Sequence, residues 1–151
     1  MVDILCNTPF NEQDVKAFFK ENDYLFPDPF AGHVDIDQYV DKISYHGFII
    51  AACDETGIVG IVGGYANDTE TYCAHLQFIL VSAENQGKGY GGHLLKEFIN
   101  YSKKQKMNTV ILTVDNCNRN AKRQYLKVGF IDSKIKHSNP QKLFMSYSIP
   151  N

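Results

Sequence analysis

The stretch "NQGKGYGGH", Asn85–His93, contains four glycines and decides how the rest of this sequence is interpreted. It follows the apolar run His75–Val81 and precedes a segment whose apolar residues recur at helical spacing. A tight turn with close helix–sheet packing would need one or two glycines, and each glycine that enters a helix costs about 1 kcal/mol relative to alanine. The cluster therefore favours a backbone that approaches a ligand closely, and N–H groups that begin a helix attract phosphate.

Length and composition describe an ordinary globular chain. Its 151 residues, 44% hydrophobic and 21% charged, are typical of one domain over residues 1–151. The net charge of −2 argues against a dedicated nucleic-acid-binding protein. No apolar run approaches the roughly 20 residues of a membrane span, and the N-terminal segment lacks signal-peptide features. Cysteines and histidines do not fall at zinc-ligand spacing. We expect a cytoplasmic protein with no metal, nucleic-acid or membrane partner.

Hydrophobic periodicity predicts elements in the order β-α-α-β-β-β-α-β-α-β-β. Short polar turns within residues 48–81 favour antiparallel hairpins, and the glycine cluster lies in the one clear βαβ crossover. The sequence thus predicts a mixed α/β domain with about four helices and a largely antiparallel sheet of about seven strands. The predicted helices are Asn11–Glu21, Asp35–Tyr45, Gly91–Lys106 and Asn118–Phe130. The predicted strands are Val2–Cys6, Phe48–Cys53, Ile58–Tyr65, His75–Val81, Thr109–Val114, Phe130–Ile135 and Leu143–Ile149.

Several phosphate ligands fit a glycine cluster of this kind. A nucleoside triphosphate loop requires G-x-x-x-x-G-K-S/T, which is absent, because Lys88 is followed by Gly89. Gly87, Gly89 and Gly92 satisfy the dinucleotide pattern G-x-G-x-x-G, and Asp115 ends the next predicted strand. However, "SAENQ" separates the glycines from the preceding strand, and too little chain remains for a doubly wound domain. A pyrophosphate at a helix N-terminus within a different fold is the favoured interpretation.

Two motifs resemble one known family. Residues Val81–Leu95, "VSAENQGKGYGGHLL", resemble the acetyl-CoA-binding motif Q/R-x-x-G-x-G/A of the GCN5-related N-acetyltransferase (GNAT) superfamily. Ala83 stands where a proline is common. Residues Asn118–Phe130, "NRNAKRQYLKVGF", are similar to the family's N-x-x-A-x-x-x-Y-x-x-x-G-F. The motifs occur in the family's order, after the meander that its fold requires. The resemblance covers about Ala74–Phe130 in sequence and the whole chain in topology, and it implies a GNAT-like fold.

The resemblance implies an enzyme that uses acetyl-CoA as co-substrate and transfers its acetyl group to an amine. In this family the pantetheine arm of coenzyme A adds like a strand beside the sheet, which would involve the backbone of Leu80 and Val81. The N–H group of Val81 would then donate to the oxyanion that forms on the thioester carbonyl. The implied cofactor-binding residues are Leu80, Val81, Gln86, Gly87, Lys88, Gly89, Tyr90, Gly91, Gly92 and Asn118.

Two residues are the catalytic candidates. Tyr125 matches the family's usual general acid, which would protonate the leaving thiolate, although a tyrosine that only packs the helix is the alternative. His75 is the first candidate for the base that takes the amine's proton, with a hydrogen-bonded structural histidine as the alternative. The run "AHLQFILVS" resembles a strand of arylalkylamine N-acetyltransferases in which two histidines alternate, and Gln77 replaces the second one. A period of two places residues 75, 77 and 79 on one face.

The sequence indicates the acceptor less clearly than it indicates the cofactor. The loop between the first two predicted helices is rich in aromatics, so Tyr24, Phe26, Asp28 and Phe30, together with Gln77, are the predicted acceptor-binding residues. Burial of those aromatics in the core is the alternative. We expect direct attack by a small primary amine in a ternary complex, rather than a covalent route through Cys117. A non-catalytic acyl-CoA-binding regulatory module, a peptide or protein N-acetyltransferase and a nicotinamide-dependent enzyme are the other hypotheses. Family habit suggests a homodimer.

Overall fold

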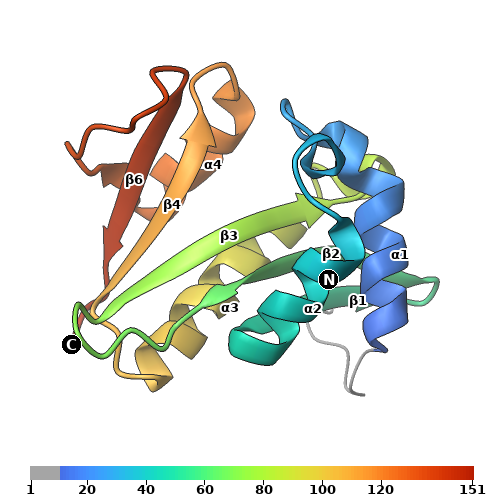
Figure 1. Ribbon diagram of the computed structural model, residues 1–151, viewed down its shortest axis with the longest axis horizontal. Coiled ribbons are helices and arrows are strands. Elements are labelled where there is room, and N and C mark those ends of the chain that lie inside the picture. Colours follow the sequence, from blue (N-terminus) through green and yellow to red (C-terminus); the bar gives the residue numbers. More distant parts are fainter. Residues whose placement is uncertain (1–10) are drawn as a thin grey trace.

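The computed structural model describes residues 11–151, within which four α-helices cover a six-stranded mixed sheet (Figure 1). The predicted elements of these residues are present, so the mixed α/β prediction is confirmed; the predicted strand Val2–Cys6 lies outside the described residues. The helices are α1 (Glu12–Asn22), α2 (Ile36–His46), α3 (Tyr90–Lys104) and α4 (Arg119–Val128). The strands are β1 (Phe48–Asp54), β2 (Gly57–Tyr65), β3 (Cys73–Val81), β4 (Thr109–Asp115), β5 (Ile131–Asp132) and β6 (Lys142–Ser148).

The strand order in the sheet is β1-β2-β3-β4-β6-β5. The pairs β1–β2, β2–β3, β4–β6 and β5–β6 are antiparallel, and β3–β4 is parallel. Helix α3 makes the crossover between the two parallel strands, as the spacing of the elements predicts. The expectation of a largely antiparallel sheet with one βαβ unit is therefore confirmed.

The parallel pair β3–β4 is short, and this opens the sheet. Residues Cys73–Leu76 pair with Thr109–Leu112, and no pairing follows. Beyond that point β3 continues along β2 as far as Val81, while β4 continues along β6 as far as Asp115. The two strands consequently diverge toward their carboxyl ends and leave a V-shaped notch in the sheet (Figure 1).

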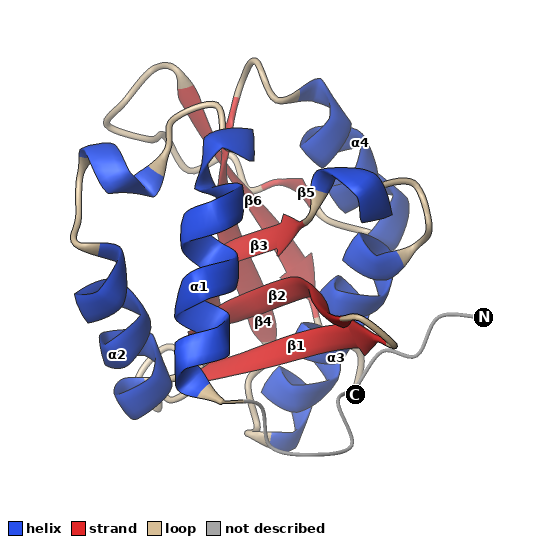
Figure 2. Ribbon diagram, turned by 90° about the vertical axis from the view of Figure 1, so that its right-hand side faces the viewer, coloured by secondary structure: helices blue, strands red, loops and turns tan. Residues whose placement is uncertain are grey.

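The helices lie on both faces of the sheet and bury two separate cores. Helices α1 and α2 cover one face (Figure 2), where Phe19 and Ile43 pack with Phe78 of β3. Helices α3 and α4 cover the other face, where Phe98 packs with Val110 and Phe130. Each of the three side-chain caps matches a helix start in the sequence: Asn11, Asp35 and Asn118 accept hydrogen bonds from backbone N–H groups of α1, α2 and α4.

A β-bulge interrupts β3 at Gln77. The register with β2 runs from Gly63 opposite Phe78 to Gly64 opposite Leu76, so Gln77 has no partner. Leu76 and Ile79 consequently pack into the same core, under α3, although they are three residues apart. The prediction that residues 75, 77 and 79 share one face is therefore wrong, because an unpaired residue reverses the alternation.

Within residues 11–151, none of the helices has both the length and the apolar character that crossing a membrane requires.

Candidate active site

The notch is the mouth of a cleft of about 1400 Å³. Its walls come from β3, β4, the loop between α1 and α2, the first turn of α3 and one side of α4. Most of the predicted site residues line it, but Tyr24, His75, Lys88 and Tyr90 do not. The predicted residues that line the cleft are Phe26, Asp28, Phe30, Gln77, Leu80, Val81, Gln86, Gly87, Gly89, Gly91, Gly92, Asn118 and Tyr125.

The start of α3 presents a row of unpaired donors, which we call the N–H cradle (residues 87–92). Among the described residues, none of these six backbone N–H groups donates a hydrogen bond, and the ladder begins with His93 N donating to Gly89 O at 3.1 Å. No side chain caps this helix. Gly87 and Gly89 have φ angles of +80° and +91°, which side chains rarely permit. Unpaired N–H groups at the positive end of a helix dipole suit an anion such as a phosphate.

The other members of the glycine cluster have different surroundings. A Cβ on Gly91 would collide with the side chain of Gln124, so this glycine lets α3 approach α4 closely. Lys88 directs its amino group to the Asn85 carboxamide at 3.3 Å, and Tyr90 is 8% exposed within the core under α3. In this structure Lys88 and Tyr90 therefore contribute to the cradle through their backbone N–H groups.

The edge of β3 next to the notch turns backbone groups away from β2. Ser82 N donates to Val59 O at 3.0 Å, which fixes the antiparallel alternation at this end of β3. By that alternation Leu80 turns its N–H and C=O toward β2, whereas Ile79 and Val81 turn theirs toward the notch. The Val81 carbonyl accepts a hydrogen bond from Gln86 Nε2 at 3.2 Å. Leu80 was predicted from the sequence and Ile79 was not, because the direction of each backbone group depends on the pairing with β2.

Tyr125 and Asn118 bound the cleft on the side of α4. Tyr125 is 6% exposed, and burial raises the pKa of its hydroxyl. This hydroxyl makes no hydrogen bond with the described residues, and no buried side-chain oxygen among them is left unpaired, so its oxygen is open to the cleft. A tyrosine in this state keeps its proton at neutral pH and can donate it. Asn118 uses its carboxamide oxygen to cap α4 at Ala121 N, at 3.2 Å.

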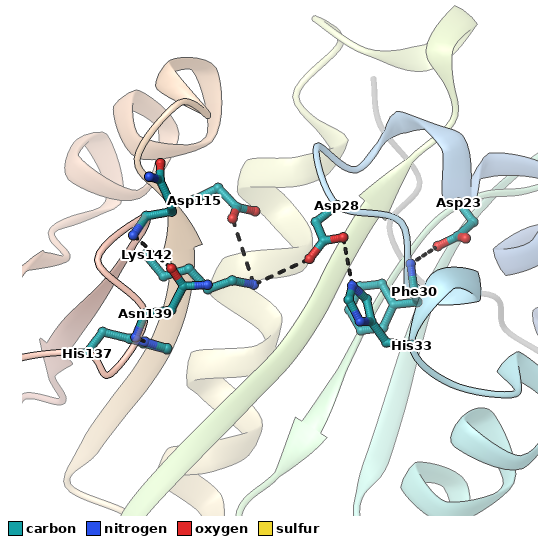
Figure 3. A network of polar contacts seen from close by, with 9 residues as sticks. Asp23, Asp28, Phe30, His33, Asp115, His137, Asn139 and Lys142 are labelled. Carbon is teal, nitrogen blue, oxygen red and sulfur yellow. Dashed lines mark hydrogen bonds and ion pairs between the residues drawn. The ribbon is translucent and has the colours of Figure 1, made fainter.

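The opposite wall is the loop between α1 and α2, held by a buried carboxylate. Asp23 is 5% exposed and accepts hydrogen bonds from Phe30 N at 2.8 Å and Ala31 N at 3.0 Å (Figure 3). Phe26 and Phe30 pack on Phe19, with ring centroids 6.0 and 5.3 Å apart, and also line the cleft. Each of these two rings is thus partly buried against the core and partly at the cleft, and their contact with an acceptor stays a prediction.

A chain of polar contacts crosses the mouth of the cleft (Figure 3). Asp28 Oδ1 lies 2.7 Å from His33 Nε2, and Asp28 Oδ2 lies 4.0 Å from Lys142 Nζ. Lys142 Nζ also lies 3.8 Å from Asp115 Oδ1 at the end of β4. The hydrogen bond from His33, together with the charge of Lys142, holds the pKa of Asp28 below its usual range. His33 and Lys142 were not predicted from the sequence, because they stand in a loop and at the start of a strand, where hydrophobic periodicity carries no signal.

His75 lies away from this chemistry. It stands where β3 is still paired on both sides, opposite Tyr65 of β2 and Ile111 of β4, and it does not line the cleft. No group of three or more His, Cys, Asp or Glu side chains in residues 11–151 is arranged to hold a metal ion.

Solved structures of acetyltransferases have this fold. The chain is similar to an aminoglycoside 6'-acetyltransferase type Ii, with a TM-score of 0.77 and 16% identity over 95% of this chain and 97% of that one. It is similar to the ribosomal-protein-S18-alanine N-acetyltransferase of Escherichia coli, with a TM-score of 0.73 and 16% identity over 94% and 92% of the two chains. A nourseothricin acetyltransferase is 22% identical with a TM-score of 0.59, over 68% of this chain and 65% of that one.

No curated protein matches this chain in sequence. The model of the acetyltransferase (GNAT) family matches residues 11–130, which include the N–H cradle, the notch and Tyr125. On this match, the chain belongs to the acetyltransferase (GNAT) family.

Proposed function

We propose that this protein transfers an acetyl group from acetyl-CoA to the primary amine of a small molecule, by direct attack in a ternary complex. The observation that carries the proposal is the N–H cradle, which opens into the same cleft as the free edge of β3 and the hydroxyl of Tyr125. A pyrophosphate, an extended amide-containing arm and a thioester are the parts of acetyl-CoA that need these three features.

The cofactor side of the cleft is suited to coenzyme A. The pyrophosphate would accept hydrogen bonds from the cradle, and the pantetheine amides would pair with the outward backbone groups of Ile79 and Val81. Asn118 would contact the arm from the opposite wall. Around the cradle, three positively charged side chains line the cleft and make no ion pair with any described residue: Lys96, Arg123 and Lys127. Their charge favours the phosphorylated adenosine end of the ligand.

Transfer would follow from these positions. The nitrogen of a neutral amine attacks the thioester carbon, and the carbonyl oxygen becomes an oxyanion that the N–H group of Val81 stabilises. Collapse of this intermediate breaks the C–S bond, and Tyr125 gives its proton to the thiolate that leaves. A base removes one proton from the attacking nitrogen, solvent returns a proton to Tyr125, and the products are an amide and free CoA thiol. No covalent intermediate on Cys117 is needed.

The acceptor side supports a small amine. Phe26 and Phe30 offer ring surface, and Asp28 offers a carboxylate at the same wall. Two of the similar structures are named for small-molecule acceptors and one for a ribosomal protein, so a peptide acceptor is the second candidate. A cytoplasmic location and a homodimer stay predictions from the sequence.

A screen for CoA release tests the proposal. The protein with acetyl-CoA is offered a panel of small amines and peptides with free N-termini, and free thiol is measured. We expect release with a subset of small amines, and Tyr125→Phe should lower kcat while the Kd for CoA, measured by calorimetry, is unchanged. Release with peptides alone would favour the second candidate. Tight CoA binding without turnover of any amine would favour a non-catalytic acyl-CoA-binding module, and tight NAD binding without CoA binding would overturn the proposal.

A further inference from the structure

We propose that His33, held in place by Asp28, is the general base that takes the proton of the acceptor amine. The inference rests on the proposed acetyl transfer and assigns a role that the sequence had suggested for His75. It is carried by the geometry of one loop and by which ionisable side chains line the acceptor side of the cleft.

The two side chains form an aspartate–histidine pair. Asp28 Oδ1 lies 2.7 Å from His33 Nε2, and both residues line the cleft (Figure 3). An ionised carboxylate can only accept a hydrogen bond, so Nε2 of His33 is the donor. In neutral His33 the proton then resides on Nε2, and Nδ1, which has no partner among the described residues, is free to accept another proton. This is the state that a general base needs.

The loop that carries the pair is fixed before any ligand binds. The backbone N–H of His33 donates to Phe30 O at 2.9 Å and closes a short 3₁₀ turn over Phe30–Gly32. The buried carboxylate of Asp23 holds the same turn through Phe30 N and Ala31 N. His33 is therefore presented on a preorganised turn, although its side chain is 61% exposed and free to meet a ligand.

The other ionisable groups on this side of the cleft are poorly suited to the task. Asp28 has a lowered pKa, so it holds a proton weakly, and burial raises the pKa of the Tyr39 hydroxyl, which therefore keeps its proton. Lys142 and Asp115 face each other at 3.8 Å. His93 belongs to the first turn of α3, beside the N–H cradle, and His75 lies outside the cleft. Of the described residues that line the acceptor wall, His33 is the one whose side-chain type exchanges protons near neutral pH.

The proposed step conserves atoms and charge. As the amine nitrogen forms its bond to the thioester carbon, one N–H proton moves to Nδ1 of His33, which becomes an imidazolium beside the Asp28 carboxylate. The C–S bond then breaks, and the thiolate receives the proton of Tyr125. His33 returns its proton to solvent, and Tyr125 recovers one from solvent, so both side chains end as they began.

Kinetics of His33→Gln and Asp28→Asn test the inference, with His75→Gln as the matched control. An amine that the wild type acetylates is used, kcat/KM is measured against pH, and the Kd for CoA is measured by calorimetry. For His33→Gln we expect kcat/KM to fall by about 10²- to 10⁴-fold near pH 7. The fall should persist up to about pH 10, because an amine that has already lost its ammonium proton to solvent still has to give up a second proton as it attacks. His75→Gln should behave as the wild type.

The Asp28→Asn variant distinguishes a His33 side chain that acts as a base from one that only supports the structure. Removal of the carboxylate disfavours the imidazolium, so the acid limb of the kcat/KM profile should move to lower pH, while the Kd for CoA is unchanged. A His33→Gln variant that binds CoA and keeps wild-type kcat/KM and pH profile would overturn the inference and leave the proposed acetyl transfer intact. A wild-type protein that binds no CoA would overturn both. Circular dichroism of each variant checks that the exposed substitutions leave the fold unchanged.

Discussion

Replacing Gly89 with alanine should harm cofactor binding much more than it harms folding. Gly89 has a φ of +91° and stands at the N-terminus of α3, in the wall of the cleft. A methyl group there would lie 3.8 Å from the His93 ring, which is an ordinary contact, so no steric clash is expected in the unliganded protein. The remaining penalty is the left-handed backbone, about 1–2 kcal/mol for a residue with a Cβ.

Gly57, the first residue of β2 directly after the turn from β1, supplies a matched control. It has a φ of +126°, and a Cβ on it would meet no atom within 4 Å. Both alanine variants should therefore lose about 1–2 kcal/mol of stability, which lowers Tm by roughly 2–8 °C in a domain of this size. In Gly89→Ala the added methyl group also stands within the N–H cradle, where we propose that the phosphate binds. Its Kd for CoA should rise at least tenfold, or about 1.4 kcal/mol, whereas Gly57→Ala binds as the wild type does.

Thermal unfolding and calorimetry with CoA give the two quantities on the same samples. A Gly89→Ala protein with a lowered Tm and a wild-type Kd would refute the idea that phosphate contacts the backbone at this position. Equal losses of affinity in both variants would also refute it, because the effect would then come from general destabilisation.

Three further outcomes are expected. Phe19→Ala removes a fully buried ring whose centroid lies 5.0 Å from that of Phe78, so the free energy of unfolding measured in urea should fall by about 3–5 kcal/mol. Tyr24→Ala, at a residue that is 67% exposed, should leave this free energy almost unchanged. Dephospho-CoA should bind more weakly than CoA, and Arg123→Ala should reduce that difference, because Arg123 is a positively charged residue that lines the cleft. Equal affinities of the wild type for CoA and dephospho-CoA would contradict this. The pKa of Asp28 is lowered in the fold, so its stabilising effect is present above the unfolded value and lost as pH falls through the folded one. The stability difference between wild type and Asp28→Asn should accordingly shrink as pH falls below about 4, and a difference that stays constant there would contradict this sign.

Most of the fold could be predicted because its signals are local. Apolar spacing and capping residues locate α1, α2 and α4 to within one or two residues, and the polar turns locate the hairpins. The exception is β5, which was predicted over Phe130–Ile135 and covers Ile131–Asp132. Lys134 has a φ of +64°, and its N–H group donates to the Asp132 carboxylate at 2.8 Å, so a turn ends the strand. The alternation of apolar and polar residues does not predict a turn that a single carboxylate stabilises.

The candidate site was likewise predictable only where its signals are local in sequence. The N–H cradle and Tyr125 belong to spaced motifs, so the sequence located both. The faces to which the side chains of β3 point could not be predicted from the sequence, because the bulge at Gln77 depends on the pairing with Gly63 and Gly64 of β2. Gly64 lies so close to the His75 carbonyl that a Cβ would not fit there. The contacts among Asp28, Lys142 and Asp115 join three distant parts of the chain, and only the folded topology brings them to one mouth.

The early end of the β3–β4 ladder has a consequence for solution behaviour. Among the described residues, the edges of β3 and β4 that face the notch are left without a strand partner, and edges of this kind recruit strands from other chains. A thin, extended molecule with amide groups can enter and complete the sheet for as long as it stays bound. The liganded protein should therefore resist self-association and aggregation better than the ligand-free protein, by a route that is separate from any gain in its melting temperature.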